Sequence, residues 1–140
     1  MPSSSRPLRV ALATLVTGAA LLSACAAPVT DADKRNGKTL VTYTGEVRDC
    51  PTTRVTGLVT QNPRGCFELD GSPLVLPTGT TWADDGTTVR LPGGAQLRSG
   101  AVVSGQVCSE APLPEWAGFD CGVGTSDPTK GLVGPVDVQQ

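Results

Sequence analysis

The sequence predicts an all-β protein that folds as one small barrel, with a β-sandwich as the alternative architecture. Short apolar segments rich in Val, Leu and Thr alternate with polar residues, as strands with one buried face do. Glycine and proline, 17 and 12 of the 140 residues, interrupt these segments at intervals of roughly 8–15 residues. No segment carries a helical period of useful length, so the domain is expected to consist of strands and turns.

Six segments carry this strand pattern, and turn residues separate them. They are residues 40–47, 55–60, 66–69, 74–76, 87–91 and 101–107. Asp70-Gly71 is a hairpin signal after the third segment. Pro77 and Pro92 end the fourth and fifth segments, because proline cannot donate a hydrogen bond to a sheet. Residues 74–82 are echoed by residues 89–97, which predicts two strand–turn units with the same turn chemistry.

The order of these segments resembles that of small OB-like barrels in exported bacterial proteins. A long first strand precedes the turn from Pro63 to Gly65, a Leu-rich strand follows, and Gly100 precedes a Val-x-x-Gly-x-Val strand. The resemblance covers about residues 40–108. It implies that segment 101–107 closes the barrel and that Gly105 lets this strand bend.

Residues 1–24 have the pattern of an export signal. Arg6 and Arg9 make the start positive, and the 15 residues from Val10 to Ala24 carry no charge. This apolar run is shorter than the 20 or so residues that a membrane span needs. A buried N-terminal helix is one alternative. Ordinary secretion, with a cut beside Ala26 or Ala27, is another.

The run ends in Leu22-Ser23-Ala24-Cys25, which resembles the lipobox of bacterial lipoproteins. The resemblance implies that cleavage leaves Cys25 as the first residue and that its thiol carries a diacylglyceryl group. Two or three acyl chains then anchor the protein stably. The expected location is the cell membrane, with the domain on the extracytoplasmic side.

The remaining chain divides into three expected parts. Residues 25–38 hold the lipidated cysteine and a flexible tether, residues 39–124 form the β-barrel domain, and residues 125–140 are an extended tail with a possible edge strand at 133–138. Asp31-x-Asp33 begins like a calcium loop, but Arg35 stands where the next oxygen ligand is needed. No metal site is predicted there.

Cys50, Cys66, Cys108 and Cys121 remain once Cys25 is set aside. Disulfides persist outside the cytoplasm, so two disulfides are expected, and four cysteines allow three pairings. The favoured pairing is Cys50–Cys66 with Cys108–Cys121, because each closes a short loop. The nested pairing, Cys50–Cys121 with Cys66–Cys108, is the main competitor. A zinc site is the rival use, although the close cysteine spacing of zinc ribbons is missing.

The composition argues against catalysis. The chain has no histidine, and its lysines lie outside the predicted barrel. The acidic residues sit mostly beside Gly or Pro in expected turns, where Asp serves local backbone hydrogen bonds. Without the signal segment, nine basic residues face thirteen acidic ones, which is no footprint for nucleic acid. The sequence therefore predicts a protein that is not an enzyme and holds no cofactor or metal.

The segment 113–120 is the expected binding surface, with Glu115, Trp116 and Phe119 as its candidate contacts. Aromatic side chains on Pro- and Gly-flanked loops mark contact surfaces. The alternative is that Trp116 and Phe119 plug one end of the barrel; Trp82 is assigned to the core. The predicted function is a non-enzymatic envelope lipoprotein that binds another envelope protein, a glycan or a lipid. A structural accessory without a ligand and a carboxylate-dependent hydrolase are the alternatives.

Overall fold

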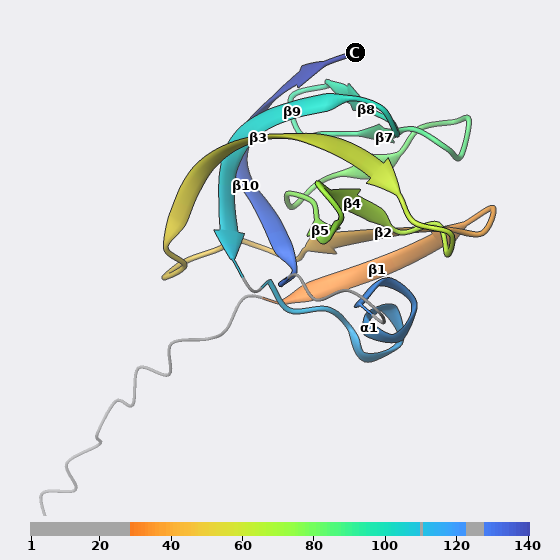
Figure 1. Ribbon diagram of the computed structural model, residues 1–140, viewed down its shortest axis with the longest axis horizontal. Helices are drawn as coiled ribbons and strands as arrows, with labels where there is room; N and C mark the ends of the chain where they lie inside the picture. The colour runs from red at the N-terminus through yellow and green to blue at the C-terminus, as the bar shows by residue number, and fades with distance from the viewer. Residues whose placement is uncertain (1–28, 110, 123–127) are drawn as a thin grey trace, which may run out of the picture.

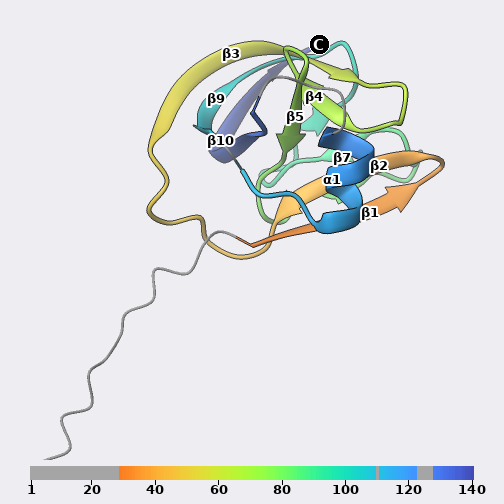
Figure 2. The same cartoon turned by 60° about the horizontal axis from the view of Figure 1, so that its bottom comes forward.

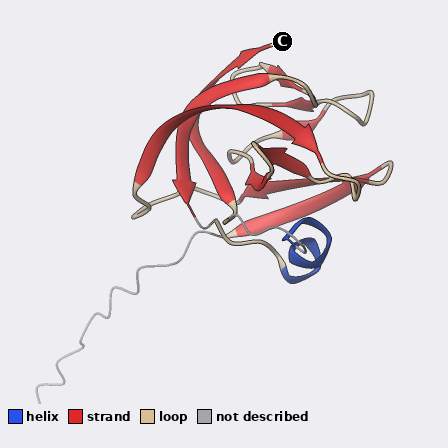
Figure 3. Cartoon of the chain, viewed as in Figure 1, coloured by secondary structure: helices blue, strands red, loops and turns tan. Residues whose placement is uncertain are grey.

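The structure, a computed structural model, describes residues 29–109, 111–122 and 128–140, with only the backbone for Glu115, Trp116 and Phe119 (Figure 1). Within these ranges the protein is all-β, and strands make up most of the fold (Figure 3). Its centre is a closed barrel of five strands. The predicted fold class is therefore confirmed, and the β-sandwich alternative is wrong.

The barrel strands follow the order of an OB barrel. They are β3 (Thr52–Gln61), β4 (Phe67–Leu69), β5 (Ser72–Val75), β9 (Val102–Ser109) and β10 (Lys130–Gln139). Around the barrel their order is β10-β5-β4-β3-β9, and β9 pairs with β10 to close it. All neighbours are antiparallel except β5 and β10, which run parallel. Among the five barrel strands, counted along the chain, the third (β5) thus pairs with the fifth (β10), as in OB folds.

Strand β10 corrects the prediction that segment 101–107 closes the barrel and that residues 125–140 are a tail. The expected closing strand is β9, the fourth strand of the barrel, and β10 closes it. Pro135 within this run argues against a central strand. In the structure the β9–β10 register shifts between Val133 and Asp137, so Pro135 lies in an irregular stretch where its missing N–H breaks no ladder bond.

Strands β1 (Thr30–Arg35) and β2 (Lys38–Tyr43) form a hairpin outside the barrel. This corrects the flexible tether predicted for residues 25–38, because residues 30–35 form a strand and Lys38 begins the next one. Asn36-Gly37 makes the turn, with positive φ angles of 49° and 72°, and Asn-Gly is a strong hairpin signal. The polar composition of Thr30–Arg35 concealed it. Strand β2, expected as the first barrel strand, lies outside the barrel. It contacts the barrel just after β5, where Tyr43 N donates a hydrogen bond to Leu76 O at 3.0 Å.

Three two-residue strands lie between β5 and β9 in the chain. Strands β6 (Thr81–Trp82), β7 (Val89–Arg90) and β8 (Gln96–Leu97) form a small antiparallel sheet. Its register aligns Trp82, Val89 and Leu97, and all three side chains are buried in the main core. The assignment of Trp82 to the core is confirmed. The main core also contains Val59, Phe67, Leu69, Leu76, Val103 and Leu132.

A short helix, α1 (Glu115–Gly122), packs against β2 beside the barrel (Figure 2). The sequence predicts no helix, and this prediction is wrong for these eight residues. Ala117 and Cys121, one turn apart, are buried in a second cluster with Val41, Tyr43 and Val75. A helix of eight residues is too short to produce a visible period in the sequence.

The four cysteines form two disulfides in the third of the three possible pairings, which is neither the favoured nor the nested one. Cys50 bonds Cys108 with a Cα–Cα distance of 5.9 Å, and Cys66 bonds Cys121 at 5.4 Å. Both the favoured pairing and the nested pairing are wrong. Strand register decides the first bond, because β3 and β9 are neighbours with Thr52 opposite Cys108. The second bond attaches α1 to the start of β4.

Candidate functional site

The residues proposed from sequence as the binding surface lie at α1 and just before it. Glu115, Trp116 and Phe119 fall within α1, but their side chains are not described. Cys25, the predicted lipidation site, lies before the first described residue. The four disulfide cysteines are the predicted site residues that the structure places, and they brace the fold.

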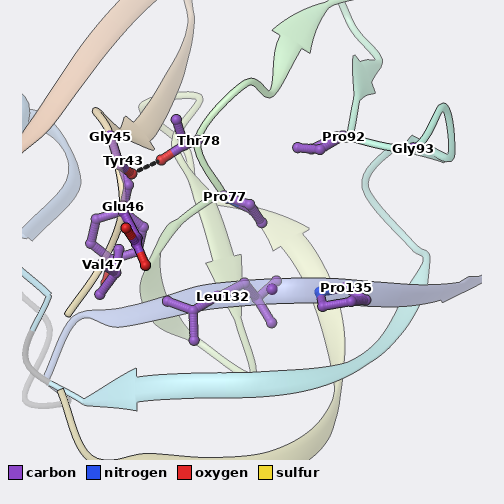
Figure 4. A pocket seen from close by; sticks show the side chains of 12 residues that line it. Tyr43, Gly45, Glu46, Val47, Pro77, Thr78, Pro92, Gly93, Leu132 and Pro135 are labelled. Carbon is purple, nitrogen blue, oxygen red and sulfur yellow. Dashed lines mark hydrogen bonds between the residues drawn. The ribbon is translucent and has the colours of Figure 1, made fainter. Parts of the chain in front are cut away.

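A pocket of about 510 Å³ opens beside β10 (Figure 4). The sequence did not predict a site there. The volume of the pocket falls within the range of small-ligand sites, about 300–1,000 Å³. Four separate segments build its walls: residues 43–47, Pro77 and Thr78, Pro92 and Gly93, and residues 132–135. These segments are far apart in the chain, so only the barrel topology brings them together.

Glycine and proline shape the walls. Gly45, Gly93 and Gly134 have φ angles of 86°, 91° and 71°, a backbone conformation that other residues rarely adopt. Prolines stand in three of the four walls, where their rings add apolar surface and they have no backbone N–H to donate. The Thr78 hydroxyl donates a hydrogen bond to the Gly45 carbonyl and so ties two walls together (Figure 4). The lining is therefore chiefly apolar and held in shape by its backbone.

Tyr43 lies in the wall with its side chain almost fully buried. Its hydroxyl has no hydrogen-bond partner among the described residues, and burial raises its pKa to about 12. Gly131 provides the space, because a Cβ on this residue would lie 1.8 Å from the hydroxyl oxygen. At neutral pH the phenol is therefore uncharged and is no ready proton acceptor.

Glu46 is the carboxylate of the pocket lining, and an arginine engages it. Arg48 donates from Nη2 to Glu46 Oε2 at 2.6 Å and from Nε at 3.1 Å. The hydrogen bond and charge of Glu46 raise the pKa of Arg48. Both side chains are largely exposed, so this ion pair belongs to the rim. Among the described residues, the walls around it contain no second carboxylate that could complete an acid–base pair.

Three acidic side chains, those of Asp70, Asp85 and Asp120, make contacts within the fold. Asp85 accepts hydrogen bonds from Thr87 N at 2.9 Å and from Thr88 N at 2.8 Å. Asp70 accepts one from Leu58 N at 2.9 Å, and Asp120 pairs with Lys34 at 3.2 Å. Among the described residues, no group of three or more His, Cys, Asp or Glu side chains is arranged to hold a metal ion.

A second, smaller pocket of about 180 Å³ lies between the β1–β2 hairpin and β6. Asp31, Asp33, Arg35 and Trp82 contribute to its lining. The Trp82 indole N–H is buried without a hydrogen-bond partner in the described structure. Asp33 and Arg35 form an ion pair at 3.6 Å, so two of the charged groups in this polar pocket already pair with each other.

Within the described ranges, no helix has the length and apolar character required to cross a membrane. Comparisons of the chain with protein-family models, curated proteins and solved structures found no match.

Proposed function

We propose that this protein is a lipoprotein of the bacterial cell envelope whose barrel is a non-enzymatic binding module. In this proposal the acyl groups on Cys25 hold the domain on the extracytoplasmic side of the membrane. The lipobox residues Leu22-Ser23-Ala24-Cys25 support the anchor. The two disulfides suit this location, because such bonds persist in oxidising compartments.

The pocket beside β10 is the observation that carries the binding role. Its walls are mostly Pro, Gly, Val and Leu, and its carboxylate is engaged by Arg48. Such a surface fits an apolar group, from a lipid or from an envelope protein, better than a glycan, which needs many polar partners. The uncharged Tyr43 and the paired Glu46 also argue against acid–base chemistry in this pocket.

The anchor is tested by metabolic labelling of the full chain with radioactive palmitate in a bacterial host. Wild-type protein is expected to carry the label, and Cys25→Ala to carry none, because the thiol that accepts the lipid is gone. Ser23→Ala is the matched control, since a small residue remains in the lipobox and labelling should persist. Wild-type protein without label, or label that persists in Cys25→Ala, would contradict the proposal.

A further inference from the structure

We infer that one acyl chain carried by Cys25 occupies the pocket beside β10. The inference rests on the proposed lipidation of Cys25 and names the occupant of the pocket.

The chain enters the fold next to the pocket. Val29 O accepts a hydrogen bond from Thr44 N at 2.8 Å, and Thr44 immediately precedes the wall residue Gly45. Cys25 lies four residues before Val29, and four residues span at most about 14 Å when fully extended. With β1 beginning at Thr30, little chain separates the lipid attachment site from the pocket.

The walls suit a hydrocarbon chain. Val133 and Val47 contribute aliphatic surface, and the Glu46–Arg48 ion pair is confined to the exposed rim. Val29, with 60% of its surface exposed, is one of two large apolar residues that the described part of the chain leaves in solvent. An apolar side chain therefore stands where the lipidated segment joins the fold.

Attachment to the same molecule favours this occupant over a free lipid. A short tether gives its own chain an effective concentration in the millimolar range at a site within reach. A mature lipoprotein carries two acyl chains on the thioether and often a third on the amino group. When the third chain is present, two chains remain in the bilayer and are sufficient for stable anchoring, so one chain can enter the pocket without releasing the protein.

Photo-crosslinking in the full, processed protein tests the inference. Cells are fed a palmitate analogue with a diazirine near its methyl end, the membranes are irradiated, and crosslinked peptides are mapped by mass spectrometry. The expected crosslinks join the Cys25 lipid to residues 43–47 and 132–135 of the same molecule. Crosslinks only to bilayer lipids, or to peptides outside the pocket, overturn the inference.

Charged variants supply the matched comparison. Val47→Glu and Pro135→Glu each place a carboxylate in the walls and should lower the crosslink yield by about tenfold, because an unpaired charge is costly in an apolar site. Leu58→Glu replaces an exposed apolar residue outside the pocket and should leave the yield unchanged. Pro135 is exposed, so its variant keeps the test valid if Val47→Glu fails to fold. Equal yields in all three variants overturn the inference.

The two proposals fail in different ways. If the analogue is absent from Cys25, the proposed anchor fails and this inference fails with it. If the analogue is present on Cys25 but crosslinks only to lipid, the anchor stands and the occupied pocket alone is wrong.

Discussion

At the scale of single residues, Gly131 and Tyr43 determine whether the barrel can close against β2. Tyr43 is 2% exposed, and its hydroxyl fills the place where a Cβ on Gly131 would stand. Because β10 pairs with both β5 and β9 at Gly131, its backbone cannot shift freely away from Tyr43. A glycine is therefore required here for space, whereas the pocket glycines are required for their backbone conformation.

Gly131→Ala is expected to destabilise the fold by about 1–3 kcal/mol, the usual cost of overpacking a core. Adding Tyr43→Phe should recover part of this loss, since the atom nearest to the new methyl group is removed. Urea denaturation measures both effects. Gly118→Ala in α1 is the control, because the nearest atom there is 3.9 Å away and alanine favours helix. Equal stability of Gly131→Ala and Gly118→Ala would count against the described packing.

Asp85 gives the fold a pH dependence. Hydrogen bonds from the Thr88 hydroxyl and from the Thr88 and Thr87 amides lower the pKa of Asp85 well below its ordinary value. A carboxylate with a depressed pKa stabilises the folded state above its unfolded pKa, near 4, and this contribution is lost as the pH falls toward the folded pKa.

Asp85→Asn should therefore reduce stability at pH 7, and the difference from wild type should shrink below about pH 4. Thermal melts across a pH series measure this, with the exposed neighbour Asp84→Asn as the control. A deficit of the same size at pH 3 and pH 7 would mean that the charge of Asp85 does not stabilise the turn.

At the scale of elements, the sequence predicted strands better than it predicted their partners. Each of the six predicted segments overlaps a strand, because alternation and turn residues are local signals. The echo of residues 74–82 in 89–97 is also reproduced: Trp82 and Leu97 flank Val89 in one small sheet, and Gly79 and Gly94 take similar φ angles of 87° and 95°. These features depend on neighbours in the chain.

The missed elements depend on contacts between distant segments. β1 is polar along most of its length and is held by its hairpin partner β2. β10 contains Pro135, and its residues after Val133 are exposed or only half-buried, yet Leu132 within it is fully buried. Composition alone assigns such segments to a tether and a tail. The pocket also depends on contacts between distant segments, because its four walls meet only after β10 has closed the barrel.

The closing role of β10 predicts that Leu132→Ala costs about 2–5 kcal/mol, as deletion of a fully buried leucine usually does. Val138→Ala on the same strand should cost less, because Val138 is only partly buried. Chemical denaturation of the two variants provides the comparison. If residues 125–140 were a dispensable tail, both substitutions would leave the unfolding midpoint unchanged.

The disulfides make a prediction about pairs of elements. Cys50–Cys108 joins the approach to β3 with β9, and Cys66–Cys121 joins the start of β4 with α1. Non-reducing peptide mapping should recover these two linked peptides. A Cys50→Ala/Cys108→Ala variant should lose about 4 kcal/mol, because the bond closes a loop of 58 residues. A peptide that joins Cys50 to Cys66 would contradict the described topology.

At the scale of the whole molecule, the structure combines an OB-ordered barrel, a side sheet and a hairpin that brings the N-terminal end of the fold beside a pocket. The lipid attachment site proposed at Cys25 lies only four residues before this point, in place of the longer tether expected from composition. The domain is thus expected to stay close to the membrane surface. Its disulfide-bonded barrel would hold the proposed binding pocket there.

The most direct test of this account is the intact mass of the protein purified from bacterial membranes. We predict a chain of residues 25–140 that carries two or three acyl groups and lacks two hydrogens for each of two disulfides. A chain that begins after Cys25 without lipid, one that keeps residues 1–24, or one with four free thiols would contradict the account.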